Sequence, residues 1–328
     1  MTPHRLGPIV LLLACAACAG QEAPAAHPEP VTTDVGGDSA PAMNRGPALS
    51  PLADSIAQSL VFLPRNQKWF TAAARGKRML IDLGRVDVEV RKDSARAHAY
   101  REAVASRSPL ALGSHLRLHG PWGADDVEIA GFDTWNGRIV AVLRAPAHVD
   151  ALARRVEPLP AAARIAETET ADTQTPVATP SCARDSIPPG YLERVLFVRD
   201  SLEQQLRLES VMPYDRLVPT ITVKNTVAPG CFGEGRTIVV SSLRAGAYEV
   251  VREKIVMISD SGAVTPVRLV GSRWRAHEAI YAFDADGDGT DDLAVKGTSD
   301  RAGGMVIFKL IEGPRLEKLV GGFNWETR

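Results

Sequence analysis

The predicted fold depends most on the stretch FDADGDGTDDLAV, which occupies residues 283–295. Within it, Asp284, Asp286, Asp288 and Asp292 stand at positions 1, 3, 5 and 9 of a loop that turns at Gly289. This spacing can bring carboxylate oxygens together around one hard cation, because the glycines let the backbone curl over it. Ca²⁺ accepts six to eight oxygen ligands in irregular geometry, so the stretch predicts a calcium site.

The second half of this loop departs from an EF-hand. Position 12 of an EF-hand is a bidentate glutamate and position 8 is apolar, whereas here they are Val295 and Asp291. Thr290 would add its backbone carbonyl as a ligand. The flanking segments 279–283 and 293–296 are short and apolar, which predicts two strands rather than two helices. An acidic, solvated hairpin turn that holds no ion is the alternative interpretation.

The run from Phe283 to Val295 resembles the calcium loop of the FG-GAP/VCBS-type repeats of bacterial surface proteins and integrin-like propellers. Those repeats place an aspartate-rich loop between adjacent strands. The resemblance covers roughly residues 278–297 and implies a calcium-binding β-hairpin. Propellers contain several such repeats, and this chain contains one.

The N-terminal segment has the pattern of an export signal. A short basic start, MTPHR, precedes an apolar run from Leu6 to Ala14 that is far shorter than the roughly 20 residues of a membrane span. The run leads into LLACAAC at residues 12–18, which resembles the lipobox of bacterial lipoproteins. The resemblance implies a signal peptide over 1–18, a lipid on Cys15 (alternatively Cys18), and a membrane-anchored protein of the bacterial cell envelope, facing the periplasm or the surface. An ordinary signal peptide with incidental cysteines is the other interpretation.

Residues 19–50 are rich in Ala, Pro, Gly and small polar residues and have no apolar periodicity. Such a segment buries too little surface to offset its ordering entropy, so we expect a disordered tether. Beyond it, composition and turn signals predict two mainly β domains, 52–156 and 190–328, joined by a linker at 157–189 that lacks a strand pattern.

The expected fold class is mainly β (α+β): two small antiparallel domains with a few helices and the calcium loop in a hairpin of the second domain. Helical periodicity predicts helices near 52–60, 94–106 and 190–211. Strands are expected at 79–83, 86–90, 114–119, 126–132 and 138–144, and then at 220–224, 237–241, 248–258, 264–270, 278–283, 293–296 and 305–311.

Two cysteines, Cys182 and Cys231, lie outside the signal region. In an exported protein an isolated pair is most simply a disulfide, with free buried thiols or a metal pair as alternatives. His115 and His119 can share one strand face, but no third ligand stands at metal-like spacing, so we expect surface histidines. The net charge of −1 gives no basis for nucleic-acid binding, and an aromatic content of 5% argues against a carbohydrate-stacking face.

The sequence contains no Gly-x-Ser-x-Gly elbow, His-Glu-x-x-His motif, phosphate-binding loop or dinucleotide fingerprint. Two hypotheses therefore remain. The first is a lipid-anchored, non-catalytic envelope module that calcium stabilises and that binds a protein or glycan partner. The alternative is an envelope hydrolase with paired carboxylates at the domain interface, as in a glycosidase. The candidate carboxylates for it are Asp82, Asp87, Asp125, Asp126 and Asp133.

Overall fold

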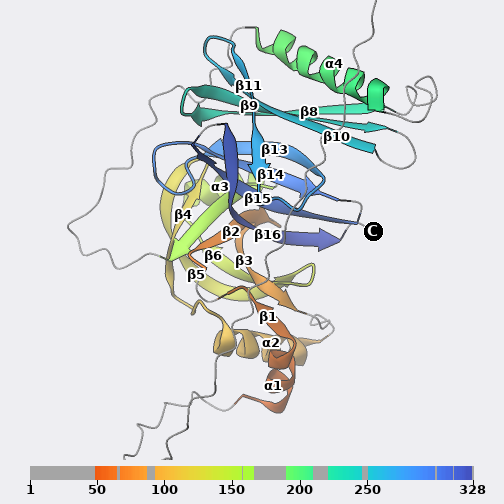
Figure 1. Cartoon of the computed structure of the whole chain (residues 1–328). Coiled ribbons are helices and arrows are strands. Elements are labelled where there is room, and N and C mark those ends of the chain that lie inside the picture. The colour runs from red at the N-terminus through yellow and green to blue at the C-terminus, as the bar shows by residue number, and fades with distance from the viewer. Residues whose placement is uncertain are drawn as a thin grey trace, which may run out of the picture. The chain divides into compact units, whose positions relative to one another are not determined.

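The computed structural model describes residues 49–64, 67–86, 93–156, 158–165, 190–209, 221–245, 250–299, 301–312 and 314–326 (Figure 1). The predicted signal peptide, Cys15, Cys18, nearly all of the tether, Cys182 and Asp87 lie outside these residues. The described elements belong to one compact unit, Gly46–Arg328. No helix in the described ranges combines the length and the apolar character needed to cross a membrane.

Strands dominate the described chain, and four helices accompany them. The helices are α1 (Pro51–Gln58), α2 (Ser94–Arg107), α3 (Ala147–Arg155) and α4 (Tyr191–Glu209). The strands are β1 (Leu60–Phe62), β2 (Trp69–Arg75), β3 (Arg78–Val86), β4 (His115–Gly120), β5 (Gly123–Trp135), β6 (Arg138–Arg144), β7 (Pro160–Ile165), β8 (Thr222–Phe232), β9 (Gly235–Ala245), β10 (Val250–Ser259), β11 (Val264–Pro266), β12 (Arg268–Val270), β13 (Ala276–Phe283), β14 (Asp292–Thr298), β15 (Ala302–Ile311) and β16 (Arg315–Glu326).

The N-terminal half is a closed antiparallel sheet. Its strands follow the order β3-β2-β7-β4-β5-β6, a further pairing of β3 with β6 completes the circle, and β1 adds to β3. Because side chains alternate along a strand, Phe70, Ala72 and Ala74 of β2 enter one large buried cluster inside the sheet. The helices α1, α2 and α3 add apolar residues to the same cluster.

The outer face of β2 and β3 is also buried, and it carries small residues. Ala73 and Leu80 pack with Met305 of β15 and Phe323 of β16 in a second cluster, so the C-terminal half covers this face. Near-continuous burial along β2 and β3 follows from this double covering. It explains the unbroken apolar and small-residue runs in the sequence of these strands.

The strand β7 corrects the expectation that the linker at 157–189 lacks a strand. Residues 160–165 pair with β2 on one side and β4 on the other. Ala161 and Ala163 join the interior cluster, while Ala162 packs outward against the C-terminal half. Alanine has low strand propensity, so the sequence pattern does not predict this strand. The small side chains are needed because both faces of β7 are closely packed.

The C-terminal half contains two facing sheets. One has the order β11-β10-β9-β8, and the other has the order β12-β16-β15-β14-β13. All their pairings are antiparallel except that of β12 with β16. Along β14, Leu293 and Val295 face the four-stranded sheet, whereas Ala294 faces the N-terminal half. The five-stranded sheet is therefore buried on both sides.

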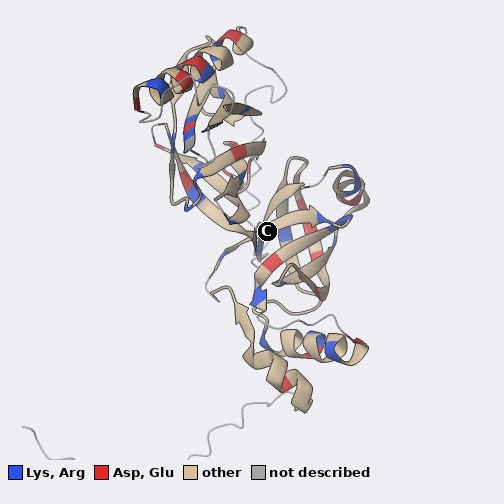
Figure 2. Cartoon of the chain, turned by 90° about the vertical axis from the view of Figure 1, so that its right-hand side faces the viewer, with Lys and Arg blue, Asp and Glu red and all other residues tan. Residues whose placement is uncertain are grey.

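The helix α4 lies on the outer face of the four-stranded sheet (Figure 1). Val195, Val198, Leu202 and Leu206 recur at helical spacing and are buried against β9 and β10, which confirms the predicted helix. The helix also carries both acidic and basic residues (Figure 2). The expected mainly β, α+β fold with antiparallel sheets is thus confirmed.

A buried carboxylate connects the two halves. Asp82 on β3 is fully buried and accepts hydrogen bonds from Arg138 at 2.9 Å, from the Gly84 amide at 3.0 Å and from the Phe323 amide of β16. Gly322 fits directly above Asp82, since a Cβ atom at that position would lie 2.8 Å from the carboxylate. The halves therefore share polar as well as apolar contacts.

Candidate metal centre

The acidic loop joins the end of β13 to the start of β14, as the sequence predicts. The Asp284 carboxylate organises it, because Oδ1 accepts from the Gly287 amide at 2.7 Å and Oδ2 accepts from the Gly289 amide at 2.9 Å. Both glycines have positive φ, +84° and +86°, which side-chain-bearing residues rarely adopt. The two glycines thus let the backbone wrap around one carboxylate.

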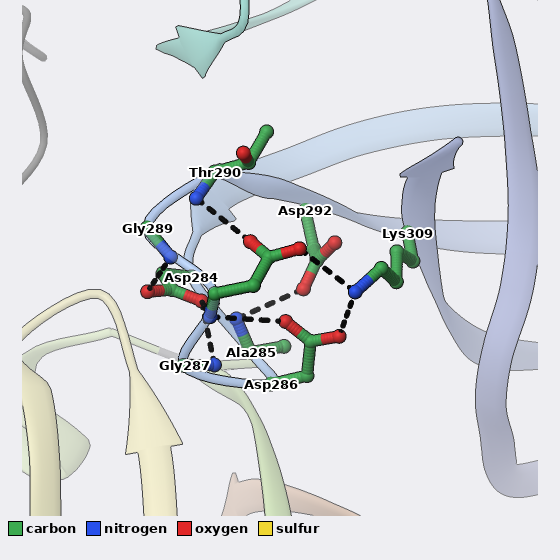
Figure 3. A network of polar contacts seen from close by, with 9 residues as sticks. Asp284, Ala285, Asp286, Gly287, Gly289, Thr290, Asp292 and Lys309 are labelled. Atoms are coloured by element: carbon green, nitrogen blue, oxygen red, sulfur yellow. Dashed lines mark hydrogen bonds and ion pairs between the residues drawn. The ribbon is translucent and has the colours of Figure 1, made fainter. Parts of the chain in front are cut away.

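Three carboxylates converge within this loop. Ligand atoms of Asp284, Asp286 and Asp292 lie within 4.8 Å of one another, a separation that one cation can bridge (Figure 3). Asp292 is 1% exposed, and its Oδ2 accepts from the Ala285 amide at 2.9 Å, which fixes its orientation. An oxygen-rich group of this kind suits a hard cation such as Ca²⁺.

Asp288 and Thr290 occupy the outer part of the loop. The Thr290 amide donates to Asp288 Oδ1 at 2.8 Å, and the Asp288 amide donates to Asp284 Oδ1 at 3.1 Å. Asp288 is outside the group of three converging carboxylates. The assignment of Asp288 and Thr290 as ligands stays a prediction.

Lys309 on β15 is a member of the site that sequence reasoning missed. Its Nζ pairs with Asp286 and, at 2.8 Å, with Asp288, and Figure 3 shows the ammonium between these two carboxylates. Nothing near Lys309 in the sequence marks it, because the pairing depends on β15 lying beside β14. The ammonium supplies positive charge where a bound cation would also act.

The carboxylates of the loop have unequal proton affinities. Burial, together with the charges of Asp286 and Asp288, raises the pKa of Asp292 to about 8. Burial also raises the pKa of Asp284. Burial acts in the same direction on Asp288, but the hydrogen bonds from Lys309 and Thr290 outweigh it and lower its pKa. Ionisation of the inner carboxyl groups is therefore unfavourable by itself, and a bound cation would favour their charged form.

Asp291, which departs from the EF-hand pattern, anchors the loop to the neighbouring sheet. It is fully buried, its Oδ2 accepts from the Cys231 amide at 2.6 Å, and its own amide donates to the Cys231 carbonyl at 2.8 Å. Position 8 is polar here because it faces the backbone of β8 rather than an apolar core.

His119 is not a surface histidine, and that prediction was wrong. It is 4% exposed, and its ring lies edge-on to Trp69 with centroids 5.7 Å apart. A Cβ atom added to Gly287 would lie 3.7 Å from its ring, so His119 forms part of the wall against the loop. Burial, aided by the positive charges of Arg164 and Arg117, lowers the pKa of His119 to about 4. His115, four residues earlier on β4, is exposed as expected.

The other predicted site residues are not among the loop ligands. Cys231 is buried on β8, and its expected disulfide stays a prediction because Cys182 lies outside the described residues. Each described carboxylate of the hydrolase hypothesis is paired with a basic residue. The pairs are Asp82–Arg138 at 2.9 Å, Asp125–His148 at 2.9 Å, Asp126–Arg117 at 3.1 Å and Asp133–Arg78 at 3.0 Å.

No family model, curated protein or solved structure matches the chain. The loop geometry therefore defines the class of site on its own: an aspartate-rich hairpin loop with three converging carboxylates and one neighbouring ammonium group.

Proposed function

We propose that the loop at residues 284–292 binds Ca²⁺ and that the ion stabilises the C-terminal sheets of a lipid-anchored protein of the bacterial cell envelope. The observation that carries the calcium proposal is the convergence of Asp284, Asp286 and Asp292 within 4.8 Å. Asp288 and the Thr290 carbonyl would complete the oxygen shell. The ion holds β13 and β14 in register and performs no chemistry.

The spacing and burial of the loop support a modest affinity. It lacks the bidentate glutamate of an EF-hand, and Lys309 competes for two of its carboxylates. Extracellular modules of this kind bind Ca²⁺ at roughly 10⁻⁴–10⁻³ M. At tenfold excess over such a constant, binding to the folded state adds about 1.4 kcal/mol to the free energy of unfolding.

Thermal melting of the full chain tests the calcium site. Millimolar Ca²⁺ should raise the melting temperature of the wild type relative to chelator and leave Asp286→Ala and Asp288→Ala unmoved. Glu234→Gln, which changes an exposed acid in the turn between β8 and β9, is the matched control and should respond like the wild type. Equal melting of the wild type in Ca²⁺ and in chelator, with no heat of binding at millimolar ion, would show a solvated turn.

Membrane attachment is tested separately. The lipobox-like run supports a lipid on Cys15, or alternatively on Cys18. Cys15→Ser together with Cys18→Ser should move the protein from the membrane fraction to the soluble fraction. Retention in the membrane fraction with uptake of labelled palmitate by the double variant would contradict the lipoprotein proposal. A protein or glycan partner in the envelope remains part of the proposal.

A further inference from the structure

Three polar side chains form a continuous chain of hydrogen bonds between the two C-terminal sheets. Ser272 Oγ lies 2.6 Å from His277 Nε2, and His277 Nδ1 lies 2.8 Å from Glu253 Oε1. Glu253 belongs to β10, His277 to β13, and Ser272 to the segment between β12 and β13. A hydroxyl, an imidazole and a carboxylate in this order have the geometry of an activated nucleophile.

The hydrogen bonds define the tautomer of His277. A carboxylate only accepts, so Nδ1 carries the proton donated to Glu253 and Nε2 is left to accept from the Ser272 hydroxyl. The Trp274 amide donates to Ser272 Oγ at 3.2 Å, which directs the hydroxyl proton towards His277. The His277 ring is therefore poised to take the proton of Ser272.

The positions of the acid and the base are held firmly. The second oxygen of Glu253 accepts from the His277 amide at 2.5 Å, so both of its oxygens bind one residue. The His277 ring also lies edge-on to Phe308 with centroids 6.2 Å apart. His277 and Glu253 have exposed side-chain fractions of 5% and 16%, which limits competition from water.

Ser272, by contrast, lies near the surface. It is half-buried, and its neighbours Gly271 and Arg273 are exposed. Gly271 has a φ of +82°, and this turn presents the serine at the start of the segment that leads into β13. Within the described part of the chain, the amides of Ser272 and Arg273 donate to no acceptor, so they are available to an incoming oxygen.

We propose that Ser272, His277 and Glu253 form a serine-nucleophile site that hydrolyses small, unhindered carboxylic esters. Ser272 Oγ bonds to the acyl carbon while its proton passes to His277 Nε2. The C–O bond to the alcohol then breaks, and the alcohol leaves with that proton. In the second step the oxygen of water bonds to the acyl carbon while its proton passes to His277 Nε2. The bond from that carbon to Ser272 Oγ then breaks, Oγ takes the proton back from His277, and the carboxylic acid is released. Glu253 acts through His277 and is a positioning residue.

This activity goes beyond the calcium site and does not depend on it. His277 is the second residue of β13, whereas Asp284 follows the last residue of that strand, so the two sites lie at opposite ends of β13. Ser272 is half-buried between exposed neighbours, which is the reason for assigning small, unhindered esters. This activity replaces the expectation of a non-catalytic module.

Covalent labelling of the full chain tests the proposal. A fluorophosphonate probe forms an O–P bond with an activated serine and releases fluoride, and peptide mass analysis should place it on Ser272. Ser272→Ala should abolish this label and the hydrolysis of p-nitrophenyl acetate. His277→Gln should slow labelling about 100-fold, because it removes the general base. Ser261→Ala is the matched control, since the Ser261 hydroxyl lies 2.8 Å from the Ser259 hydroxyl, and labelling should be unchanged.

The positioning role of Glu253 needs a second comparison. Glu253→Gln should slow labelling at least about tenfold, and Glu253→Asp should restore part of the rate. Circular dichroism and melting of every variant identify loss of folding. Two outcomes would overturn the proposal. In the first, Ser272 of the folded wild type stays unlabelled under conditions in which the probe labels a known serine hydrolase. In the second, the wild type and a folded His277→Gln variant are labelled at equal rates. The three side chains would then be a structural network between the sheets.

Discussion

Lys309 lies where one residue would set the affinity of the proposed cation site. Its ammonium pairs with Asp286 and Asp288, so a cation that binds these carboxylates must displace it or share them. The lysine partly neutralises the loop without an ion, so under the calcium proposal it would stabilise the hairpin and lower the affinity for calcium. Deleting the charge separates these two effects.

Lys309→Met should therefore strengthen calcium binding while lowering stability in chelator. The pairs are partly exposed, with 32% of the lysine side chain accessible, and such pairs contribute up to about 1 kcal/mol. The dissociation constant should fall about fivefold, as measured by calorimetric titration. Lys318→Met, on the adjacent strand β16 and exposed, is the control and should leave affinity unchanged. Weaker binding in Lys309→Met would mean that the lysine supports the site rather than competing with the ion.

At the scale of elements, packing decided which segments became strands. β14 and β15 were recognisable because both carry apolar runs that are buried on two faces. β7 was not, because its alanines resemble linker composition, yet it is a central strand between β2 and β4. β7 differs from β14 and β15 because other elements approach it so closely on both faces that small residues are favoured. Small residues have low strand propensity, so the sequence gives little indication of a strand there.

The packing of α2 against the closed sheet predicts a pH dependence. Tyr100 of α2 is 2% exposed and its hydroxyl donates to the Asp133 carbonyl at 3.1 Å. Burial, and then the charge of Asp133, raises the pKa of Tyr100 above its ordinary value of 10. When the pKa of a phenol is higher in the folded than in the unfolded state, its contribution to the free energy of unfolding is complete at pH values below the unfolded pKa. That contribution is lost as the pH rises from the unfolded pKa through the folded pKa.

Denaturant unfolding between pH 8 and 11 measures this contribution. Relative to Tyr100→Phe, the wild type should lose about 1.4 kcal/mol for each pH unit above 10. The difference between the two proteins removes the effect of lysines that titrate in the same range. A difference that stays constant over the whole interval would contradict the predicted shift.

For the whole molecule, the buried Asp82 carboxylate connects the halves, because it pairs with Arg138 in the N-terminal half and accepts from the Phe323 amide in the C-terminal half. Asp82→Ala leaves Arg138, which is 12% exposed, without its carboxylate and removes the acceptor of the Phe323 amide. Loss of one partner of a buried pair costs about 3–5 kcal/mol. Chemical denaturation should show this loss. Asp126→Ala is the control, because its exposed pair with Arg117 should contribute less than about 1 kcal/mol, and equal effects would refute the argument.

The acidic loop, its flanking strands, the helix at Tyr191–Glu209 and the mainly β fold class were predictable from the sequence alone. Each of these depends on residues close together in the chain: alternating aspartates with glycines, and apolar side chains at the period of a strand or helix. The spacing of Asp284, Asp286 and Asp292 is enough by itself to indicate a cation site, and the folded loop brings these three carboxylates together.

Tertiary structure alone decided the closed sheet, the role of β7, and the contacts of Lys309, His119 and Asp291. It also decided the alignment of Ser272 with His277 and Glu253, which come from three different segments. Each of these contacts joins residues that strand order brings together, and strand order depends on which faces pack in the folded chain. Local sequence patterns do not predict that order. For example, the residues around a lysine in the sequence do not show whether it lies beside an acidic loop or in solvent.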